Sequence, residues 1–444
     1  MMSAPDNYHF NLPIFHYTVI GAPGILAMSI FSFSKPVATA CFSAVVLIVS
    51  GFVSKETMAA QGSQNITGPD SVDSLLEKDK RRLRRYRDNW DLHKSQIYAD
   101  TGLKFGFDYN ALGLWASGSL GETDASSGAF RAFGRWDLSG EQVGERGSMV
   151  FKFEHRHAYT DVPPFNFGSE TGYAGLLNTV YSDQGFRTST LYWRQEFDRN
   201  RGLAFFGFLD VTDYTDIFAF GSPWQSFGNM AFESGSGTIG GLPDGAFGFM
   251  LGKMLTPNIY VVGGMVDANA DATDISQGFQ TFFEQFETFK SFDIGYTSGR
   301  DELFLNNWHV SFWQIDKREQ AGRPSGWGVS FSASSQVKEV WQPFFRGGWS
   351  DGGGASYDAS VSIGFGYVPA SKNYLLGVGL NWASPSEEEY GDDVRNQWTS
   401  ELFYRFAFSP NTELTLSMQI LLNPALDNGR DSIVLPGLRF RGAF

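Results

Sequence analysis

The sequence predicts an all-β fold: a single 16-stranded antiparallel transmembrane β-barrel with a short N-terminal helix. Three observations support this prediction. Apolar and polar residues alternate with a period of two in many segments after residue 98. The connections between these segments tend to be alternately short and long. No linker or change of composition divides this part of the 444-residue chain, so we expect it to form one domain.

Residues 1–60 are expected to be a signal peptide. The run at residues 36–53 is apolar, a lysine precedes it, and small residues follow at 59–60, which is the usual order in a secretory signal. The residues before Met28 fit no export signal, so we expect translation to start there. A membrane-spanning helix is the alternative, although the run is slightly shorter than the ~20 apolar residues that cross a bilayer.

Residues 61–98 are predicted to be a helical periplasmic segment. Apolar residues lie at roughly helical spacing from Val72 to Trp90, and lysines and arginines are concentrated between Lys78 and Arg87. This basic helix would lie at the barrel mouth or contact anionic lipid. The alternative is a solvated helix with a modest docking stripe.

The overall composition excludes two classes of protein. The net charge of -14 argues against binding to nucleic acid. Cys41 is the only cysteine and lies in the expected signal peptide. The mature chain would therefore have neither disulfides nor thiolate metal sites.

Residues 99–444 are predicted to form the barrel, with sixteen strands. The hairpin at residues 398–420 has the clearest pattern, because alternate residues are apolar on both sides of a turn containing a proline. Long connections such as 213–244 alternate with tight ones such as 198–201, as in outer-membrane barrels. The predicted strands are 103–117, 128–139, 147–160, 187–198, 202–212, 245–256, 258–268, 288–297, 308–316, 326–335, 341–349, 357–368, 374–384, 397–409, 411–421 and 432–444.

The direction of the two strand faces follows from the width of such a barrel. Sixteen strands enclose a space too wide for side chains to fill, so the polar face should surround water and the apolar face should meet lipid. Tyr357 and Tyr367 lie at the two ends of one apolar strand face. At ~3.3 Å per residue and ~45° tilt they are roughly 23 Å apart along the membrane normal, close to the ~25 Å apolar band.

Five stretches resemble the carbohydrate-selective porin family of the OprB type, and the resemblance extends from about Trp90 to Phe444. The stretches are residues 99–109, 207–214, 266–271, 347–351 and 423–424. The resemblance implies a sixteen-stranded outer-membrane barrel through which sugars diffuse passively into the periplasm. It implies carbohydrate solutes and outer-membrane lipid as partners, with no cofactor, metal or catalytic residue. Residues 234–242 and 298–325 depart from the family pattern, which leaves the sugar preference open.

Charged residues on the water-facing strand side, together with one loop tryptophan, are the candidate pore-lining and solute-binding residues. Arginine donors and carboxylate acceptors can replace the water shell of a neutral sugar, provided that the contacts remain weak and multiple. Each charge alone has the alternative of a solvated wall position. The candidates are Arg131, Arg135, Lys152, Glu154, Arg156, Arg194, Glu196, Asp210, Trp224, Glu401, Arg405, Arg439 and Arg441.

The loop at residues 213–244 is rich in aromatic residues. The family resemblance suggests that this loop folds inward and narrows the pore. Its aromatic rings would then stack on the C–H face of a pyranose. The alternative is that they only fix the loop to the wall.

The predicted function is a passive outer-membrane porin for carbohydrates or similar neutral polar solutes. The alternatives are a non-selective diffusion porin and, with less support, a barrel enzyme. The pattern Gly348–Gly352 matches a nucleophile motif, but no helix follows it. His155 and His157 share a strand face without a convincing nucleophile or third ligand. The sequence leaves a homotrimer and a monomer equally open.

Overall fold

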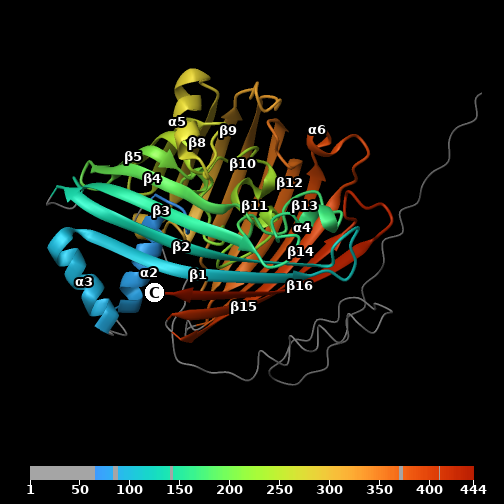
Figure 1. Ribbon diagram of the computed structural model, residues 1–444, viewed down its shortest axis with the longest axis horizontal. Helices are drawn as coiled ribbons and strands as arrows, with labels where there is room; N and C mark the ends of the chain where they lie inside the picture. Colours follow the sequence, from blue (N-terminus) through green and yellow to red (C-terminus); the bar gives the residue numbers. More distant parts are fainter. Residues whose placement is uncertain (1–65, 84–88, 141–143, 370–373, 410) are drawn as a thin grey trace, which may run out of the picture. The chain divides into compact units, whose positions relative to one another are not determined.

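Sixteen strands form one closed barrel in the computed structural model, which describes residues 66–83, 89–140, 144–369, 374–409 and 411–444. Each strand pairs antiparallel with its neighbours along the chain, and β1 closes the ring against β16 (Figure 1). This arrangement confirms the predicted fold class. The predicted signal peptide and the start at Met28 lie outside the described residues.

Every predicted strand corresponds to one observed strand, and no boundary differs by more than four residues. The strands are β1 Leu103–Trp115, β2 Asp124–Ser139, β3 Gly147–Ala158, β4 Gly185–Phe197, β5 Gly202–Leu209, β6 Ala246–Met254, β7 Ile259–Asp267, β8 Thr288–Thr297, β9 Asn306–Ile315, β10 Gly326–Ser335, β11 Trp341–Gly352, β12 Tyr357–Tyr367, β13 Tyr374–Pro385, β14 Gln397–Ser409, β15 Thr412–Leu422 and β16 Ser432–Ala443.

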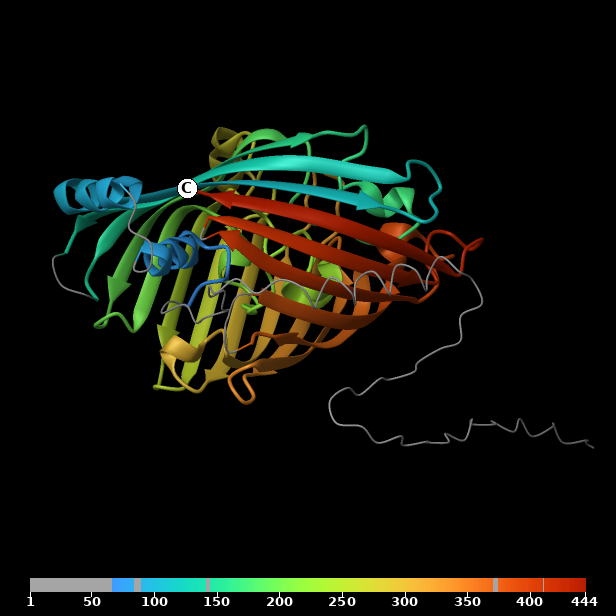
Figure 2. The same ribbon diagram turned by 90° about the horizontal axis from the view of Figure 1, so that it is seen from below.

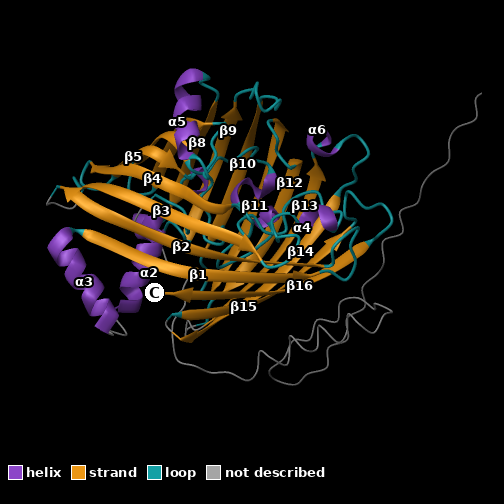
Figure 3. Cartoon of the chain, in the orientation of Figure 1, coloured by secondary structure: helices purple, strands orange, loops and turns teal. Residues whose placement is uncertain are grey.

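The two ends of the barrel differ in the length of their connections. One end, the short-turn end, carries tight turns such as residues 198–201 and 255–258. The opposite end, the long-loop end, carries the three longest connections, at residues 159–184, 210–245 and 268–287. The predicted alternation of short and long connections is therefore confirmed (Figure 3).

Two helices precede the barrel where the sequence predicts one basic helical segment: α2, Val72–Leu83, and α3, Asn89–Thr101. Residues 84–88 between them are outside the described chain, as are the side chains from Lys78 onward in α2. In Figure 2, α2 (dark blue) lies within the ring of strands, whereas α3 (lighter blue) lies beside the short-turn end. Within the described residues, no helix is both long and apolar enough to span a bilayer.

The remaining helices are short and lie in the connections. The α-helices are α4 Phe167–Glu170, α5 Ile275–Glu284 and α6 Glu387–Tyr390. The 3-10 helices are η1 Val211–Asp213, η2 Met230–Phe232, η3 Ser234–Gly237 and η4 Arg300–Glu302. Three of the 3-10 helices belong to the connection at residues 210–245, which the structure places inside the barrel.

Strand alternation separates an exposed outer face from a buried inner face. On β12, Ile363 is 56% exposed on the outside, whereas Ser362 on the inside is fully buried. The prediction for Tyr357 is wrong, because its side chain is buried and its hydroxyl is 2.7 Å from that of Tyr173. The physical reason is an irregularity in the β12–β13 register between Tyr357 and Ala359, which breaks the period of two at that end of the strand.

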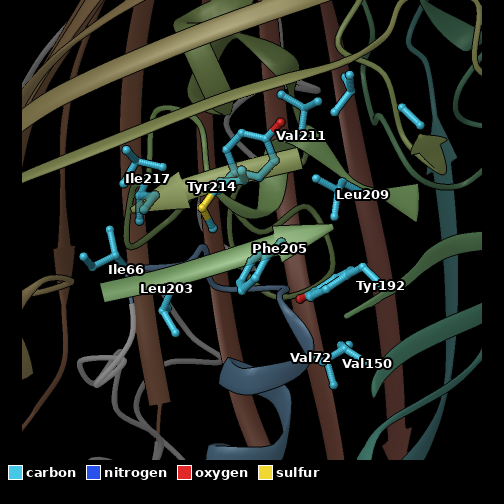
Figure 4. Close-up of a cluster of buried hydrophobic side chains, with 14 of the residues drawn as sticks. Ile66, Val72, Val150, Tyr192, Leu203, Phe205, Leu209, Val211, Tyr214 and Ile217 are labelled. Atoms are coloured by element: carbon cyan, nitrogen blue, oxygen red, sulfur yellow. The ribbon is translucent and has the colours of Figure 1, made fainter. Parts of the chain in front are cut away.

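The barrel interior is occupied largely by inserted chain rather than by wall side chains. Ile66 lies before α2 and Val72 is its first residue. Both pack with Val150, Tyr192 and Phe205 of the inner wall in one buried cluster (Figure 4). The connections at 159–184 and 210–245 supply further buried groups, such as Tyr181 and Phe227, which pack against buried wall side chains. A ring of sixteen strands needs such insertions if its interior is to be packed.

The outer face yields a direct test. We expect Ile363→Arg to destabilise the barrel in bilayers, lowering its free energy of unfolding by about 2–4 kcal/mol, because a charge near mid-membrane on the lipid face must be desolvated. Urea titration of refolding into vesicles measures this quantity. Ile363→Leu is the matched control and should change it by less than about 1.5 kcal/mol. Equal effects of the two substitutions would mean that this face meets water.

Candidate functional site

The connection at residues 210–245, called here the inner loop, is held against the far wall of the barrel by predicted pore residues. Glu401 on β14 accepts hydrogen bonds from the backbone N–H groups of Gly228 and Asn229, at 2.8 and 3.0 Å. Arg405 donates to the Gln225 carbonyl at 2.8 Å, and Arg439 donates to the Ser226 carbonyl at 2.8 Å. Glu401, Arg405 and Arg439 are buried, so they are not solvated wall charges.

A second anchor of the inner loop uses residues that the sequence analysis did not single out. Asp216 accepts from Arg346 of β11 and from His309 of β9, the latter at 2.7 Å. The backbone N–H of Asp216 donates to Asp293 of β8 at 2.6 Å. The alternation of inward and outward residues along β8, β9 and β11 places Asp293, His309 and Arg346 on the inner face, so the sequence pattern could have indicated them. The loop is therefore bonded to both sides of the barrel interior.

The aromatic residues of the inner loop divide into two groups. Phe220, Phe227 and Phe232 are buried against the wall, where the Phe227 ring centroid lies 4.9 Å from that of Phe403. A Cβ atom at Gly379 would lie 2.6 Å from the Phe232 ring, so that wall glycine makes room for the loop. These phenylalanines fix the loop to the wall, as the alternative interpretation expected.

Trp224 and Phe218 form the second group, because their rings lie against inward arginines of the wall; the Arg346 guanidinium carbon is 4.0 Å from the Phe218 ring centroid. The Arg131 guanidinium carbon lies 4.3 Å from the Trp224 ring centroid, and that of Arg156 lies 5.5 Å from it. Tyr181, from the connection 159–184, approaches the same indole with 5.0 Å between ring centroids. Cation–π contacts of this kind are strongest where water is excluded.

Each cation around Trp224 is paired with a carboxylate. Arg131 binds Asp108 through two hydrogen bonds, Nε to Oδ1 at 2.7 Å and Nη2 to Oδ2 at 2.6 Å. Arg441 also reaches Asp108, at 3.0 Å. Arg156 donates to Glu154 at 2.8 Å from Nε. Fork-shaped pairs of this kind fix both partners in orientation as well as neutralising them.

Two further pairs extend the same charged cluster. Arg187 of β4 binds Asp244 at the end of the inner loop and lies 3.9 Å from Glu154. Lys152 lies 3.2 Å from Asp210 and 3.5 Å from Asp213. We call the ion pairs around Trp224, together with those of the neighbouring Arg187 and Lys152, the paired-charge cluster. It comprises Asp108, Arg131, Lys152, Glu154, Arg156, Arg187, Asp210, Asp213, Asp244 and Arg441.

Helix α2 adds a buried acid that connects two predicted arginines. Asp73 accepts from Arg135 of β2 at 2.6 Å and from Arg194 of β4 at 2.7 Å. Arg194 also binds Glu196 at 2.7 Å. Burial raises the pKa of Asp73, but Arg194 and Arg135 outweigh it and bring the pKa to about 2. An ionised Asp73 therefore holds the start of α2 inside the barrel.

The structure thus brings the predicted site residues into three groups. Arg131, Lys152, Glu154, Arg156, Asp210 and Arg441 belong to the paired-charge cluster beside Trp224. Arg135, Arg194 and Glu196 surround Asp73, while Glu401, Arg405 and Arg439 hold the inner loop. The alternation of inward and outward residues could have predicted that Asp108 and Arg187 face the interior. No strand pattern could have predicted the position of Asp73, because it lies on a helix.

Two motifs weighed in the sequence have structural roles. Ser350 lies within β11 and donates its hydroxyl to the Tyr357 carbonyl at 2.7 Å, so it lacks the strand-to-helix turn of a nucleophile elbow. His157 lies 3.1 Å from the Tyr109 hydroxyl in an aromatic group with His155. No group of three potential metal ligands occurs in the described ranges.

A cavity of about 610 Å³ opens at the long-loop end. It is lined by the connection 159–184 alone, between Asp161 and Gln184, and the lining includes Phe165 and Glu170. None of the predicted site residues lines it. The cavity therefore lies apart from the paired-charge cluster and forms an outer recess in the loops.

Comparison with known proteins supports the fold. No family model and no curated protein matches the sequence. A high-pH structure of OprB from Pseudomonas putida superposes with a TM-score of 0.65 at 14% identity, covering 80% of this chain and 97% of that one. The low-pH structure of the same protein has a TM-score of 0.48 at 11% identity over the same shares. A mutant Rhodopseudomonas blastica porin has a TM-score of 0.48 at 9% identity, covering 77% and 100%. The first of these matches, at 14% identity, establishes a porin-type barrel fold.

The anchoring of the inner loop can be tested with Glu401→Ala. The substitution leaves two buried backbone N–H groups without acceptors, and each such group costs about 1–3 kcal/mol. We expect faster hydrogen exchange and proteolysis in residues 222–232, with the barrel still folded by circular dichroism. Glu413→Ala is the control, because Glu413 makes only a 3.6 Å ion pair with Arg441. Equal protection in both variants would contradict the anchor.

The docking of α2 should depend on pH through Asp73. Its pKa in the folded chain, about 2, is below the ordinary value of 3.8. The stabilisation that ionised Asp73 gives to the folded chain is therefore complete above pH 3.8 and is lost as the pH falls toward 2. We expect the stability difference between wild type and Asp73→Asn to be constant from pH 7 to about 4 and then to shrink.

Urea titration at each pH measures this difference. Ser74→Ala is the matched control, since Ser74 lies next to Asp73 in α2, donates to the Gly68 carbonyl before the helix and does not titrate. Its effect should not vary with pH. A difference for Asp73→Asn that persists unchanged at pH 2 would contradict an ionic role for Asp73.

Proposed function

We propose that the protein is a passive outer-membrane porin that favours neutral polar solutes, carbohydrates foremost. It is a channel rather than an enzyme in this proposal. The observation that carries it is the pairing of opposite charges throughout the interior beside Trp224. The porin-type fold supports the location in the outer membrane, with the short-turn end in the periplasm.

The pairing of charges bears directly on solute preference. An interior lined by one sign of charge attracts counter-ions and repels the other sign. In the paired-charge cluster Arg131, Arg156 and Arg187 each have a carboxylate partner, so the field of each cation is largely cancelled. Ions gain little from such a lining. A neutral solute with many hydroxyl groups can still exchange hydrogen bonds with both the donors and the acceptors.

Several buried polar atoms of this region have hydrogen-bonding capacity to spare. Among the described residues, none bonds the Nη1 of Arg131, the Oδ1 of Asn110 or the hydroxyl of Tyr181. All three side chains are buried, so a sugar would use these groups where the inserted connections around Trp224 move apart to let it through. Weak, repeated contacts of this type permit both entry and exit, which a passive pore requires.

The sugar preference can be tested with Arg131→Ala combined with Arg156→Ala. Each carboxylate keeps one cation, because Arg441 still reaches Asp108 and Arg187 still lies near Glu154. We expect monosaccharide uptake in liposome swelling to fall by about tenfold, since one charge-assisted hydrogen bond contributes at least about 1.5 kcal/mol. Reversal potentials in planar bilayers should shift toward cation selectivity.

The control is Arg201→Ala at a short turn, where the side chain is exposed, and it should leave both quantities unchanged. In the wild type we expect saturable block of the ion current by the sugar. Uptake that depends only on solute size, with no block and no effect of the double substitution, would instead support a non-selective diffusion porin.

A further inference from the structure

Helix α5 belongs to the connection at residues 268–287, yet it does not fold into the barrel as the other two long connections do. It packs beside the long-loop ends of β6 and β7 (Figures 1 and 3). Thr281 donates to Asp267 at 2.5 Å, and Asp274 caps the first turn by accepting from the Ser276 N–H at 3.1 Å. These bonds fix which face of α5 turns toward the wall.

The contact between α5 and the wall is aromatic and lies on the outer face. The ring centroid of Phe247 on β6 lies 5.0, 5.3 and 5.7 Å from the ring centroids of Phe279, Phe282 and Phe283. Phe247 is 6% exposed, whereas Phe249, the next outward residue of the same strand, is 45% exposed. Helix α5 therefore covers the outside of the barrel at this level.

The outer part of this aromatic surface, which α5 forms together with the following Phe286, remains uncovered by the wall. Phe279, Phe283 and Phe286 are 49%, 61% and 59% exposed. This patch is continuous with the lipid-facing wall, because Phe206 of β5 is exposed and its ring lies 5.4 Å from that of Phe247. The polar side of the helix carries exposed Gln280 and Glu284. An aromatic face opposite a polar one is typical of helices that lie in a membrane interface.

The length of the strands explains why such a helix is needed here. β5, β6 and β7 have 8, 9 and 9 residues and are the shortest of the sixteen, which otherwise have 10 or more. Eight residues at ~3.3 Å, tilted by ~40°, rise only about 20 Å, against an apolar band of ~25 Å. The wall is too short at this sector, and α5 extends its apolar surface beyond the strand ends.

We propose that α5 is a membrane-contact element: its phenylalanine face lies against the acyl chains of the outer leaflet and completes the apolar belt above β5–β7. The occupant of this face is lipid rather than a second copy of the chain, because the patch compensates for missing membrane-spanning wall. This assignment requires the barrel to be in a bilayer and is independent of which solute passes through it.

The test uses single cysteines in a Cys41→Ser background, each labelled with an environment-sensitive fluorophore and reconstituted into vesicles. Phe283→Cys places the label on the proposed lipid face, and Gln277→Cys is the matched control, because Gln277 is exposed and lies on the side of the helix away from the phenylalanines. We expect acyl chains brominated near the interface to quench the Phe283 label at least several-fold more than the Gln277 label, with aqueous iodide showing the reverse order. Equal quenching by iodide at both positions would overturn the proposal.

A second copy as occupant gives a different result, which would also overturn the proposal. The Phe283 label would be shielded from both quenchers, and Phe283→Cys chains would crosslink to each other in vesicles. As a second measurement, Phe279→Ser with Phe283→Ser should refold like wild type into thin bilayers but lose several-fold in refolding yield in thick ones. A loss independent of thickness would contradict the role in completing the belt.

Discussion

The structure depends on one geometric constraint: sixteen strands enclose more space than their own inward side chains can fill. The molecule meets this constraint by inserting three pieces of chain, the start of α2 and the connections 159–184 and 210–245. Backbone inside a barrel carries polar groups that must be bonded once water is displaced. The inward charged residues of β14 and β16 do this, because Glu401, Arg405 and Arg439 bond the inner-loop backbone directly. The polarity of the inner face is thus structural as well as functional.

The charges in this interior stay in place because they are balanced locally. Removing one member of a buried pair typically costs about 3–5 kcal/mol, since the other charge is left without compensation. The Asp108–Arg131 pair and the Asp73 bridge to Arg135 and Arg194 are of this kind. Local balance also limits the field that a solute meets. The same pairing therefore supports both a stable interior and a preference for neutral solutes.

The sequence predicts the wall well and the contents of the barrel poorly, for identifiable reasons. A period of two is imposed locally by the pleat, so each strand and the inward side of Arg131 or Glu401 can be predicted residue by residue. Tyr357 is misplaced because a register irregularity shifts the alternation at one strand end. Asp73 was overlooked because its partners lie more than sixty residues away, on β2 and β4, and nothing in the local pattern of a basic helix indicates them.

The three long connections pack in different places, two inside the barrel and one outside it, and their composition alone does not predict which goes where. The inner loop and α5 are both rich in phenylalanine, yet one packs inside the wall and the other outside it. What distinguishes them is the set of their polar partners. The inner loop carries Asp216, and it offers backbone N–H groups to the inward Glu401 and backbone carbonyls to inward arginines such as Arg405, which bind it within the barrel. Helix α5 bonds its backbone within the helix, caps its first turn with Asp274 and meets the wall only from outside, through Thr281 and its rings on Phe247, so it can present its remaining apolar surface to an apolar surrounding.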